Sequence, residues 1–201
     1  MLDRYREKAD KILVPVAKKI NLEANFLTYL SLASAFFAGL FAYFSYENNL
    51  LLFPSSLLIL LNGFFDALDG KIARMKGEAD EKGDFIDHLI DRFSDVFIIG
   101  GFILSPWVEK NIGIVALSAV LLVSYLGTQA QAVGYKRVYS GILGRADRIT
   151  ILFISSLIQF FVDGKIFGFY FMTWIMFYFS VAGIVTIIER YYRVIKWFEG
   201  K

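Results

Sequence analysis

The sequence contains no cysteine and a single histidine, and what it lacks excludes several kinds of site. Without cysteine, the chain can form neither a disulfide nor a thiolate metal site. Its net charge is only +2, and we expect no nucleic-acid partner. Residues 1–20 lack a long apolar run and therefore do not form a cleaved signal peptide. Neither an internal repeat nor a low-complexity stretch is present.

Apolar side chains, in contrast, are abundant. Hydrophobic residues make up 57% of the 201 positions, with 21 Phe and 11 Tyr, and the mean hydropathy is +0.54. This composition is too apolar for a soluble domain of such a length, so it predicts a membrane protein. Six apolar stretches are present. Five of them have about 20 residues, which is the length that a helix needs to cross a bilayer, and the fifth stretch is shorter. They cover residues 26–46, 50–70, 84–105, 112–134, 148–162 and 166–189.

We therefore predict an all-α fold, an integral membrane bundle of six transmembrane helices within residues 26–189. Residues 1–22 combine bases with apolar side chains and are predicted to form an N-terminal interfacial amphipathic helix. Residues 190–201 are expected to be a basic cytosolic tail, and 1–201 a single membrane domain. With six spans, most of the 21 Lys and Arg residues share one side with both termini. By the positive-inside rule this side of the cell membrane is cytosolic.

Four aspartates stand out against the apolar background. They belong to two strings, Asp66-x-x-Asp69-Gly70-x-x-Ala73-Arg74 and, after eight residues, Gly83-x-x-x-Asp87-x-x-x-Asp91. A spacing of three or four residues puts two side chains on one face of a helix, so each pair projects together. If the two helices are neighbours, the four carboxylates converge and repel one another unless cations bind. Oxygen ligands favour a hard ion, so we predict two divalent ions, Mg²⁺ or Mn²⁺, held by Asp66, Asp69, Asp87 and Asp91.

A structural alternative is that these acids pair with bases such as Arg74 or Arg92 and hold the bundle together. Charged residues inside a membrane protein are costly and usually functional, which favours a site. Asp95 extends the row of acids by one turn and is interpreted as a packing residue or a partner of Arg92. The only histidine, His88, is interpreted as a packing or hydrogen-bonding residue, and Asp84 as a cap of the third apolar helix.

The aspartate strings resemble the signature of the CDP-alcohol phosphotransferase family at each fixed position and spacing. The six-span layout resembles this family as well. The resemblance implies that an alcohol displaces CMP from a CDP-linked lipid, with the last acid, Asp91, as general base. It also implies a homodimer whose active site is a polar cavity at the cytosolic membrane surface. Two divalent ions suit this reaction, since they can clamp the attacking and leaving oxygens.

Residues beside the acids are expected to bind the CDP group. At Gly70 and Gly83 the lack of a Cβ atom lets a ligand approach the helix backbone, and Ala73 serves the same purpose. The planar guanidinium of Arg74 suits a diphosphate, since it can bind two oxygens at once.

A second nucleotide element is expected upstream. The run Asn25-x-x-Thr28 resembles a Pro-Asn-x-x-Thr element that lies near the nucleotide in this family, although Ala24 replaces the proline. Helix capping is the alternative role of Asn25 and Thr28.

The loop between the fourth and fifth apolar stretches is expected to bind the acceptor. A group of Lys and Arg residues beside a metal site favours an acceptor that carries a phosphate. Alternatively, these residues only fix the orientation of the chain in the membrane. The run from Gly144 to Arg148 resembles an Arg-x-x-Arg element of family members that use inositol phosphate. Residues 127–132 resemble an archaeal branch that makes archaetidylinositol phosphate, and their glutamines can bond inositol hydroxyls or line a helix contact. The predicted acceptor residues are Lys136, Arg137, Arg145, Arg148, Gln129 and Gln131.

These features predict a phospholipid-synthesising transferase that joins a CDP-linked lipid to inositol 1-phosphate and releases CMP. Its expected partners are the lipid donor, a phosphorylated small alcohol and membrane lipids. Glycerol 3-phosphate is the alternative acceptor, and phosphate-free acceptors such as serine would leave the basic loop without a substrate role. A divalent-cation transporter would instead need acids near the bilayer midplane on several helices. A non-catalytic scaffold would have lost one of the four acids, and all four are present.

Overall fold

The computed structural model of the chain describes residues 6–19, 22–78, 80–138 and 140–200. Within these ranges every regular element is helical, and the only β-bridge, between Ile166 and Phe169, is isolated. The prediction of an all-α fold is confirmed. The elements are α1 (Arg6–Lys19), α2 (Ala24–Phe44), the 3₁₀ helix η2 (Asn49–Leu51), α3 (Leu52–Lys76), α4 (Glu81–Leu104), α5 (Lys110–Ala132), α6 (Arg145–Phe161) and α7 (Phe171–Glu199).

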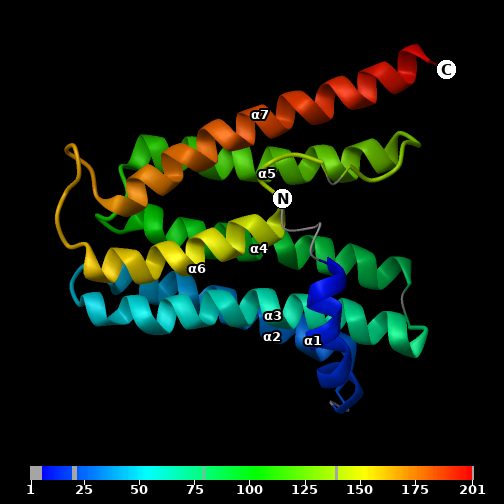
Figure 1. Cartoon of the computed structure of the whole chain (residues 1–201), viewed down its shortest axis with the longest axis horizontal. Coiled ribbons are helices and arrows are strands. Elements are labelled where there is room, and N and C mark those ends of the chain that lie inside the picture. The colour runs from blue at the N-terminus through cyan, green and yellow to red at the C-terminus, as the bar shows by residue number, and fades with distance from the viewer. Residues whose placement is uncertain (1–5, 20–21, 79, 139, 201) are drawn as a thin grey trace.

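Helices α2 to α7 lie roughly along the long axis of the molecule, and α1 crosses one end of α3 (Figure 1). Helix α2 packs against both α3 and α4, α3 packs also against α6, and α5 packs against α4 and α7. Because α2 packs against both helices of the α3–α4 hairpin, these two have little direct contact. The α3–α4 turn, the loop after α5 and the end of α7 gather at one end of the bundle, on the right in Figure 1.

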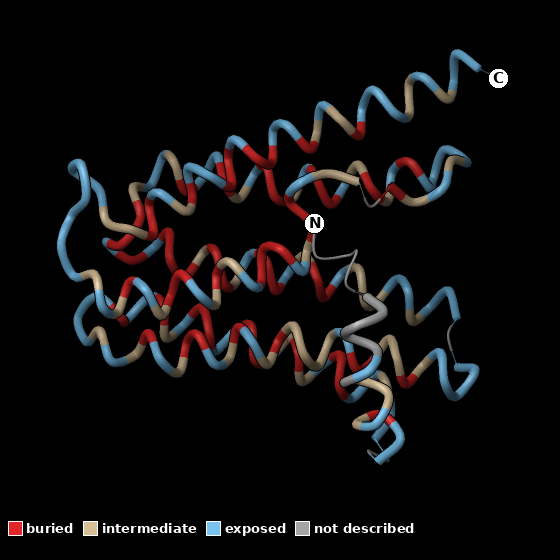
Figure 2. Tube along the Cα trace, viewed as in Figure 1, coloured by how far each residue is buried: buried red, intermediate tan, exposed pale blue. Residues whose placement is uncertain are grey.

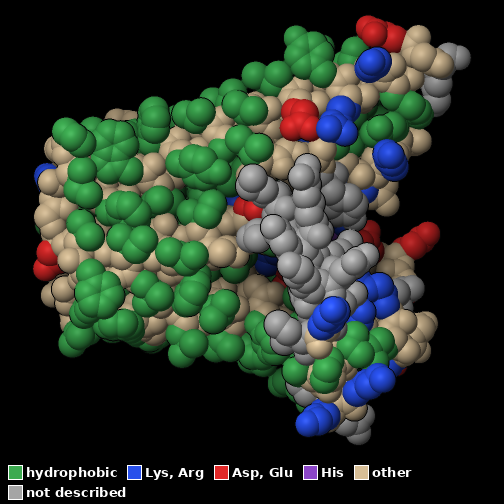
Figure 3. Space-filling view, in the orientation of Figure 1, with side chains coloured by type: hydrophobic (Ala, Val, Ile, Leu, Met, Phe, Trp, Pro, Cys, Tyr) green, Lys and Arg blue, Asp and Glu red, His purple; other side chains and the backbone are tan. Residues whose placement is uncertain are grey.

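Four of the described helical segments are long and apolar enough to cross a membrane: Ala24–Phe44, Asn49–Lys76, Lys110–Ala132 and Phe171–Glu199. Hydrophobic side chains cover most of the face seen in Figure 3. Most of the charged side chains seen there lie towards the end of the bundle that carries the α3–α4 turn, on the right. Such a surface suits a lipid environment with one polar end. The chain is therefore a membrane protein.

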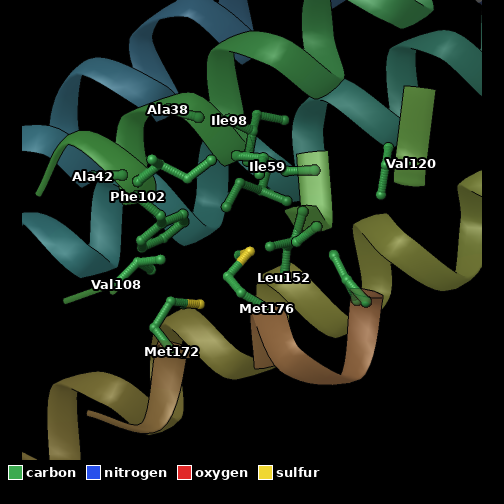
Figure 4. Close-up of a cluster of buried hydrophobic side chains, with 14 of the residues drawn as sticks. Ala38, Ala42, Ile59, Ile98, Phe102, Val108, Val120, Leu152, Met172 and Met176 are labelled. Carbon is green, nitrogen blue, oxygen red and sulfur yellow. The ribbon is translucent and has the colours of Figure 1, made fainter. Parts of the chain in front are cut away.

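The core is built from apolar side chains of α2 to α7 (Figure 4), and the buried positions of these helices lie along the inside of the bundle (Figure 2). Small residues bring α2 and α4 together, because a Cβ atom on Gly39 would meet the Phe97 carbonyl and one on Gly101 would meet the backbone of Gly39. Alanines at positions 35, 38 and 42 of α2 are fully buried. This close backbone packing fixes the position of α4 relative to α2.

The apolar stretches predict where the helices lie but not where they end. Helix α3 continues past the predicted residue 70 to Lys76 and stops at Gly77, whose φ of 70° is left-handed. Helix α4 is capped by Asp80, whose side chain accepts a hydrogen bond of 2.7 Å from the Gly83 amide, so the cap assigned to Asp84 is wrong. Hydropathy changes where side chains become polar, whereas a helix ends where its backbone groups find caps.

The two ends of the chain differ from the prediction in different ways. Helix α7 continues to Glu199, so residues 190–199 of the predicted tail are helical. For the predicted interfacial helix, the structure describes α1 alone, and residues 1–5 and 20–21 lie outside the described residues. Ala17 of α1 is buried with Leu27 and Ile72, so part of the apolar side of α1 packs on the bundle itself.

Candidate active site

The structure brings the four predicted acids to one end of the bundle. Asp66 and Asp69 lie near the end of α3, and Asp87 and Asp91 lie near the start of α4. The carboxylates of Asp66 and Asp91 both contact the side chain of Arg145. Asp69 is buried and interacts electrostatically with both acids of α4. The hairpin thus gathers carboxylates although the two helix backbones have little contact.

Arg145, at the start of α6, lies between the acids of the two helices. Its Nε atom is 2.8 Å from Asp91 Oδ1 and 3.3 Å from Asp66 Oδ2. Its Nη1 atom also donates a hydrogen bond of 3.0 Å to the Asp91 backbone carbonyl. One guanidinium therefore bridges α3 and α4, and the charge of the acids is partly balanced by a residue predicted to bind the acceptor.

Two further ion pairs surround this bridge. Arg92 Nη2 lies 3.1 Å from Asp91 Oδ2, so both carboxylate oxygens of Asp91 face arginines. The interpretation of Asp95 as a partner of Arg92 is wrong, because Asp95 Oδ2 accepts a 2.8 Å hydrogen bond from Arg148. Arg148 is 2% exposed and also donates to Ser124 at 3.4 Å. The pairing is set by α6, which lies next to the acid row, while Arg92 points to the cavity between α4 and α5.

The donor atoms of the acid cluster fit a divalent cation. Among the described residues, Asp87, His88 and Asp91 each offer a ligand atom, and these atoms lie within 4.8 Å of one another. The buried oxygen Asp69 Oδ2 has no hydrogen-bond partner in the described parts of the chain. Buried oxygens without partners are costly unless a ligand satisfies them. Carboxylate oxygens are the ligands that Mg²⁺ and Mn²⁺ prefer.

His88 was not predicted to belong to this group. Its Nδ1 atom lies 3.6 Å from Asp87 Oδ2, and its Nε2 atom lies 3.4 Å from Asp84 Oδ1. The sequence signal for it was adjacency to Asp87, which is weak because neighbouring residues of a helix face different directions.

The residues predicted to bind the CDP group border the acids. The guanidinium of Arg74 lies over Gly70, since a Cβ atom at Gly70 would be 3.3 Å from Arg74 Nη1. Ala73 lies on the same helix and is partly buried. Gly83 belongs to the first turn of α4, where a Cβ atom would be 3.0 Å from the capping oxygen of Asp80. Gly83 therefore serves the helix cap as well as any ligand.

Asn25 and Thr28 lie in the first turns of α2, next to α3. Thr28 is buried, interacts with Asp69 and donates a hydrogen bond of 3.1 Å to the Ala24 carbonyl. The alternative of helix capping is wrong for both residues, because Glu23 occupies the N-cap position and no side chain caps this helix. Asn25 is exposed.

The predicted acceptor residues do not all lie together. Arg137 approaches α4, with Nη2 at 3.3 Å from His88 Nδ1 and Nη1 at 3.8 Å from Asp84 Oδ1, whereas Lys136 is exposed. Gln131 lines a cavity of about 570 Å³ between α4 and α5, next to His88 and Arg92. Gln129 lines a separate, smaller groove between α5 and α7. Two residues apart on a helix point in nearly opposite directions, so the two glutamines cannot share one ligand.

Arg190 of α7 is a buried charged residue, although the sequence predicts it at the start of the basic cytosolic tail. Its Nε atom donates a 2.9 Å hydrogen bond to the Ser140 carbonyl, and Nη1 donates to the Val123 carbonyl. Thr186, one turn earlier, accepts a 3.3 Å hydrogen bond from the Ile142 amide. Together they hold the loop before Arg145 against α7. A charge within the span of a helix was the signal that could have identified Arg190.

Comparison with known proteins agrees with this arrangement. The sequence matches the family model described as CDP-alcohol phosphatidyltransferase over residues 21–188. Archaetidylinositol phosphate synthase of Pyrococcus horikoshii is 31% identical, and the alignment covers 99% of each chain. The protein of the same name from Methanothermobacter thermautotrophicus is 30% identical, with 94% of this chain and 92% of that protein covered.

Solved structures of phosphatidylinositol phosphate synthase from Mycobacterium tuberculosis have a similar fold. The structure with CDP-DAG bound superposes with a TM-score of 0.71 at 22% identity, covering 92% of this chain and 94% of that one. The complex of the same protein with manganese and citrate has a TM-score of 0.67, with coverages of 90% and 88%. At this identity the likeness establishes the shared fold.

Proposed function

The chain belongs to the CDP-alcohol phosphatidyltransferase family and is a transferase, and we propose that its acceptor is inositol 1-phosphate. In this reaction a phosphatidyl- or archaetidyl-type group passes from a CDP-linked lipid to a hydroxyl of the acceptor, and CMP is released. The observation that carries the proposal is the contact of Arg145 with Asp66 and Asp91, because it places an anion-binding side chain within the acid cluster. The names of the two archaeal relatives support the same acceptor.

The acid cluster would hold the metal ions and the reacting groups. Asp66, Asp69, Asp87 and Asp91 are the proposed ligands of two Mg²⁺ or Mn²⁺ ions, which, when bound, would neutralise charge on the diphosphate. The acceptor hydroxyl forms a bond to the lipid-side phosphorus, and the bond from this phosphorus to the bridging oxygen breaks. CMP leaves with the bridging oxygen. Asp91 receives the hydroxyl proton, and Arg92 and Arg145 hold its carboxylate in place.

The two substrates would approach from different sides of this cluster. Arg74, lying over Gly70, would bind diphosphate oxygens of the donor, with Ala73, Gly83, Asn25 and Thr28 bordering the nucleotide. The phosphate of the acceptor would bind Arg145, with Arg148 behind it and Lys136 and Arg137 from the preceding loop. Gln129 and Gln131 line different grooves, so at most one of them would contact the inositol hydroxyls, and Gln131, in the groove beside His88, is the proposed one.

We also propose six membrane spans, with α4 and α6 joining the four apolar segments. Support comes from their alignment with the other helices and from the alternation of connections between the two ends of the bundle (Figure 1). The end that carries the acids is then cytosolic, together with both termini, and α1 lies along the membrane surface. A single domain that spans the chain and a homodimer complete the proposal, the latter from the family resemblance alone.

Release of CMP by the purified protein tests this function. The protein is supplied with Mg²⁺ and a CDP-linked lipid, and inositol 1-phosphate, glycerol 3-phosphate, free inositol and serine are offered in separate reactions. Release with inositol 1-phosphate alone is expected. Release with glycerol 3-phosphate alone would mean that the reaction is as proposed but the acceptor is glycerol 3-phosphate. Release with free inositol or serine alone would mean that the arginines do not bind a phosphate of the acceptor.

A further inference from the structure

Asp95 lies deeper in the bundle than the four acids of the proposed metal site. It follows Asp91 by four residues, as Asp91 follows Asp87, so the three acids share one face of α4. The side chain of Asp95 is only 1% exposed. A buried carboxylate is stable only if cations or hydrogen bonds replace its lost hydration.

Both cationic partners of Asp95 come from the first turn of α6. Oδ2 accepts the 2.8 Å hydrogen bond from Arg148, and Oδ1 lies 3.9 Å from Arg145 Nη1. Arg145 and Arg148 are three residues apart and share one face of the helix. A single carboxylate thus contacts the two arginines that the proposed function assigns to the acceptor phosphate.

The negative charge of Asp95 would repel a phosphate, so its effect on the acceptor passes through the two arginines that it contacts. Arg145 divides its contacts between Asp95 on one side and the Asp66 and Asp91 carboxylates on the other. Arg148 is held by Asp95 and Ser124. Nη2 of Arg145 and Nε of Arg148 have no hydrogen-bond partner within the described residues. Both arginines therefore keep donor atoms for a further oxygen ligand while their orientation is fixed.

We propose that Asp95 is a positioning residue that orients Arg145 and Arg148 for the phosphate of the acceptor. The inference rests on the proposed function and adds a determinant of acceptor affinity to it. Without the charge of Asp95, Arg148 would remain buried beside a neutral side chain, and Arg145 would be drawn towards Asp66 and Asp91. The affinity for the acceptor falls, whereas the donor, bound through Arg74 and its neighbours, is unaffected.

Steady-state kinetics of Asp95→Asn test this role. The KM for inositol 1-phosphate is expected to rise roughly 10- to 100-fold, the factor for a lost hydrogen bond to a charged group, with the KM for the CDP-linked lipid within about twofold of wild type. Asp163→Asn, the same change in an exposed loop at the opposite end of the bundle, is the matched control. Equal rises in both KM values, or an acceptor KM equal to that of the control, overturn the inference.

A double variant keeps the test decisive if Asp95→Asn does not fold. In Asp95→Asn/Arg148→Gln both charges are removed, and a neutral buried pair is tolerated better than one unpaired charge. Asp95 bonds Arg148 at 2.8 Å and lies 3.9 Å from Arg145, so most of its effect passes through Arg148. The acceptor KM of the double variant is therefore expected within about tenfold of that of Arg148→Gln, and a larger rise contradicts the inference. Wild-type protein in the same assay separates the two proposals. If it uses only glycerol 3-phosphate, the proposed acceptor is wrong, and the same KM comparison with that acceptor still decides the role of Asp95.

Discussion

Asp91→Asn is the substitution for which the structure gives the most detailed expectation. The side chain that it neutralises faces Arg145 Nε at 2.8 Å and Arg92 Nη2 at 3.1 Å. Asparagine has nearly the same shape but neither charge nor the capacity to take up a proton. Removal of a positioned general base lowers kcat by about 10²- to 10⁴-fold, and Asp91 is also a proposed metal ligand, so we expect a loss of at least about 10³-fold.

The same substitution has a cost in stability. Arg145 retains Asp66 and Asp95 as partners, whereas Asp91 is the carboxylate that pairs with Arg92. Breaking a buried ion pair from one side costs about 3–5 kcal/mol, and Arg92 is 26% exposed, so the lower value, about 3 kcal/mol, is expected. Thermal unfolding of the variant, beside Asp163→Asn as control, measures this loss separately from catalysis.

Two measurements decide whether Asp91 acts in the chemical step. CMP release gives kcat and the KM for the CDP-linked lipid, and direct binding of the lipid gives its affinity. We expect kcat to fall with little change in lipid binding, because the residues proposed to bind the CDP group, Arg74 and Gly70, lie on α3 and not on α4. A variant that retains more than a tenth of the wild-type kcat would falsify the role of Asp91 as base.

Three further substitutions test the metal site and the helix packing. Asp87→Asn is expected to weaken Mn²⁺ binding at least tenfold, measured by electron paramagnetic resonance of the free ion. Gly101→Ala puts a methyl group against the Gly39 backbone and should lower the free energy of unfolding by about 1–3 kcal/mol, whereas Gly100→Ala, with no atom within 4 Å, should not. Asp80→Ala removes the cap of α4 and should cost about 1 kcal/mol in the same unfolding measurement, and an unchanged midpoint would contradict that cap.

Features of this fold that depend on residues close together in the sequence could be predicted from the sequence. Each of the six predicted apolar stretches overlaps one of the helices α2 to α7, and the spacing of the aspartates places each pair on one helix face. The helix ends were less predictable, because Gly77 and Asp80 act through backbone geometry that hydropathy does not register. The extension of α7 was missed for the same reason, since a helix can continue after its side chains become polar.

Contacts between distant segments could not be predicted in this way. Nothing local to Arg145 indicates that it bridges Asp66 and Asp91, which lie 79 and 54 residues away in the sequence. A basic residue in a loop is equally compatible with a topology signal and with a substrate ligand, and its partners become known only when α6 is placed beside α3. The separation of Gln129 from Gln131 follows from helical geometry, but which of them faces the site depends on the packing of α5 against α4 and α7.

A buried polar network explains how acids on two helices with little mutual contact stay in register. Asn62 precedes Asp66 by one turn of α3, is fully buried, and donates hydrogen bonds of 3.0 Å to Ser31 Oγ of α2 and 3.1 Å to Ser94 Oγ of α4. These bonds join α2, α3 and α4 one helical turn from the acid cluster, on the side of the bundle interior. Apolar packing alone would let neighbouring helices slide, whereas these hydrogen bonds from the Asn62 amide nitrogen fix the relative height of the helices. The position of the carboxylates is therefore determined by the hydrogen bonds of Asn62 between the helices and by the ion pairs of Arg145 with Asp66 and Asp91.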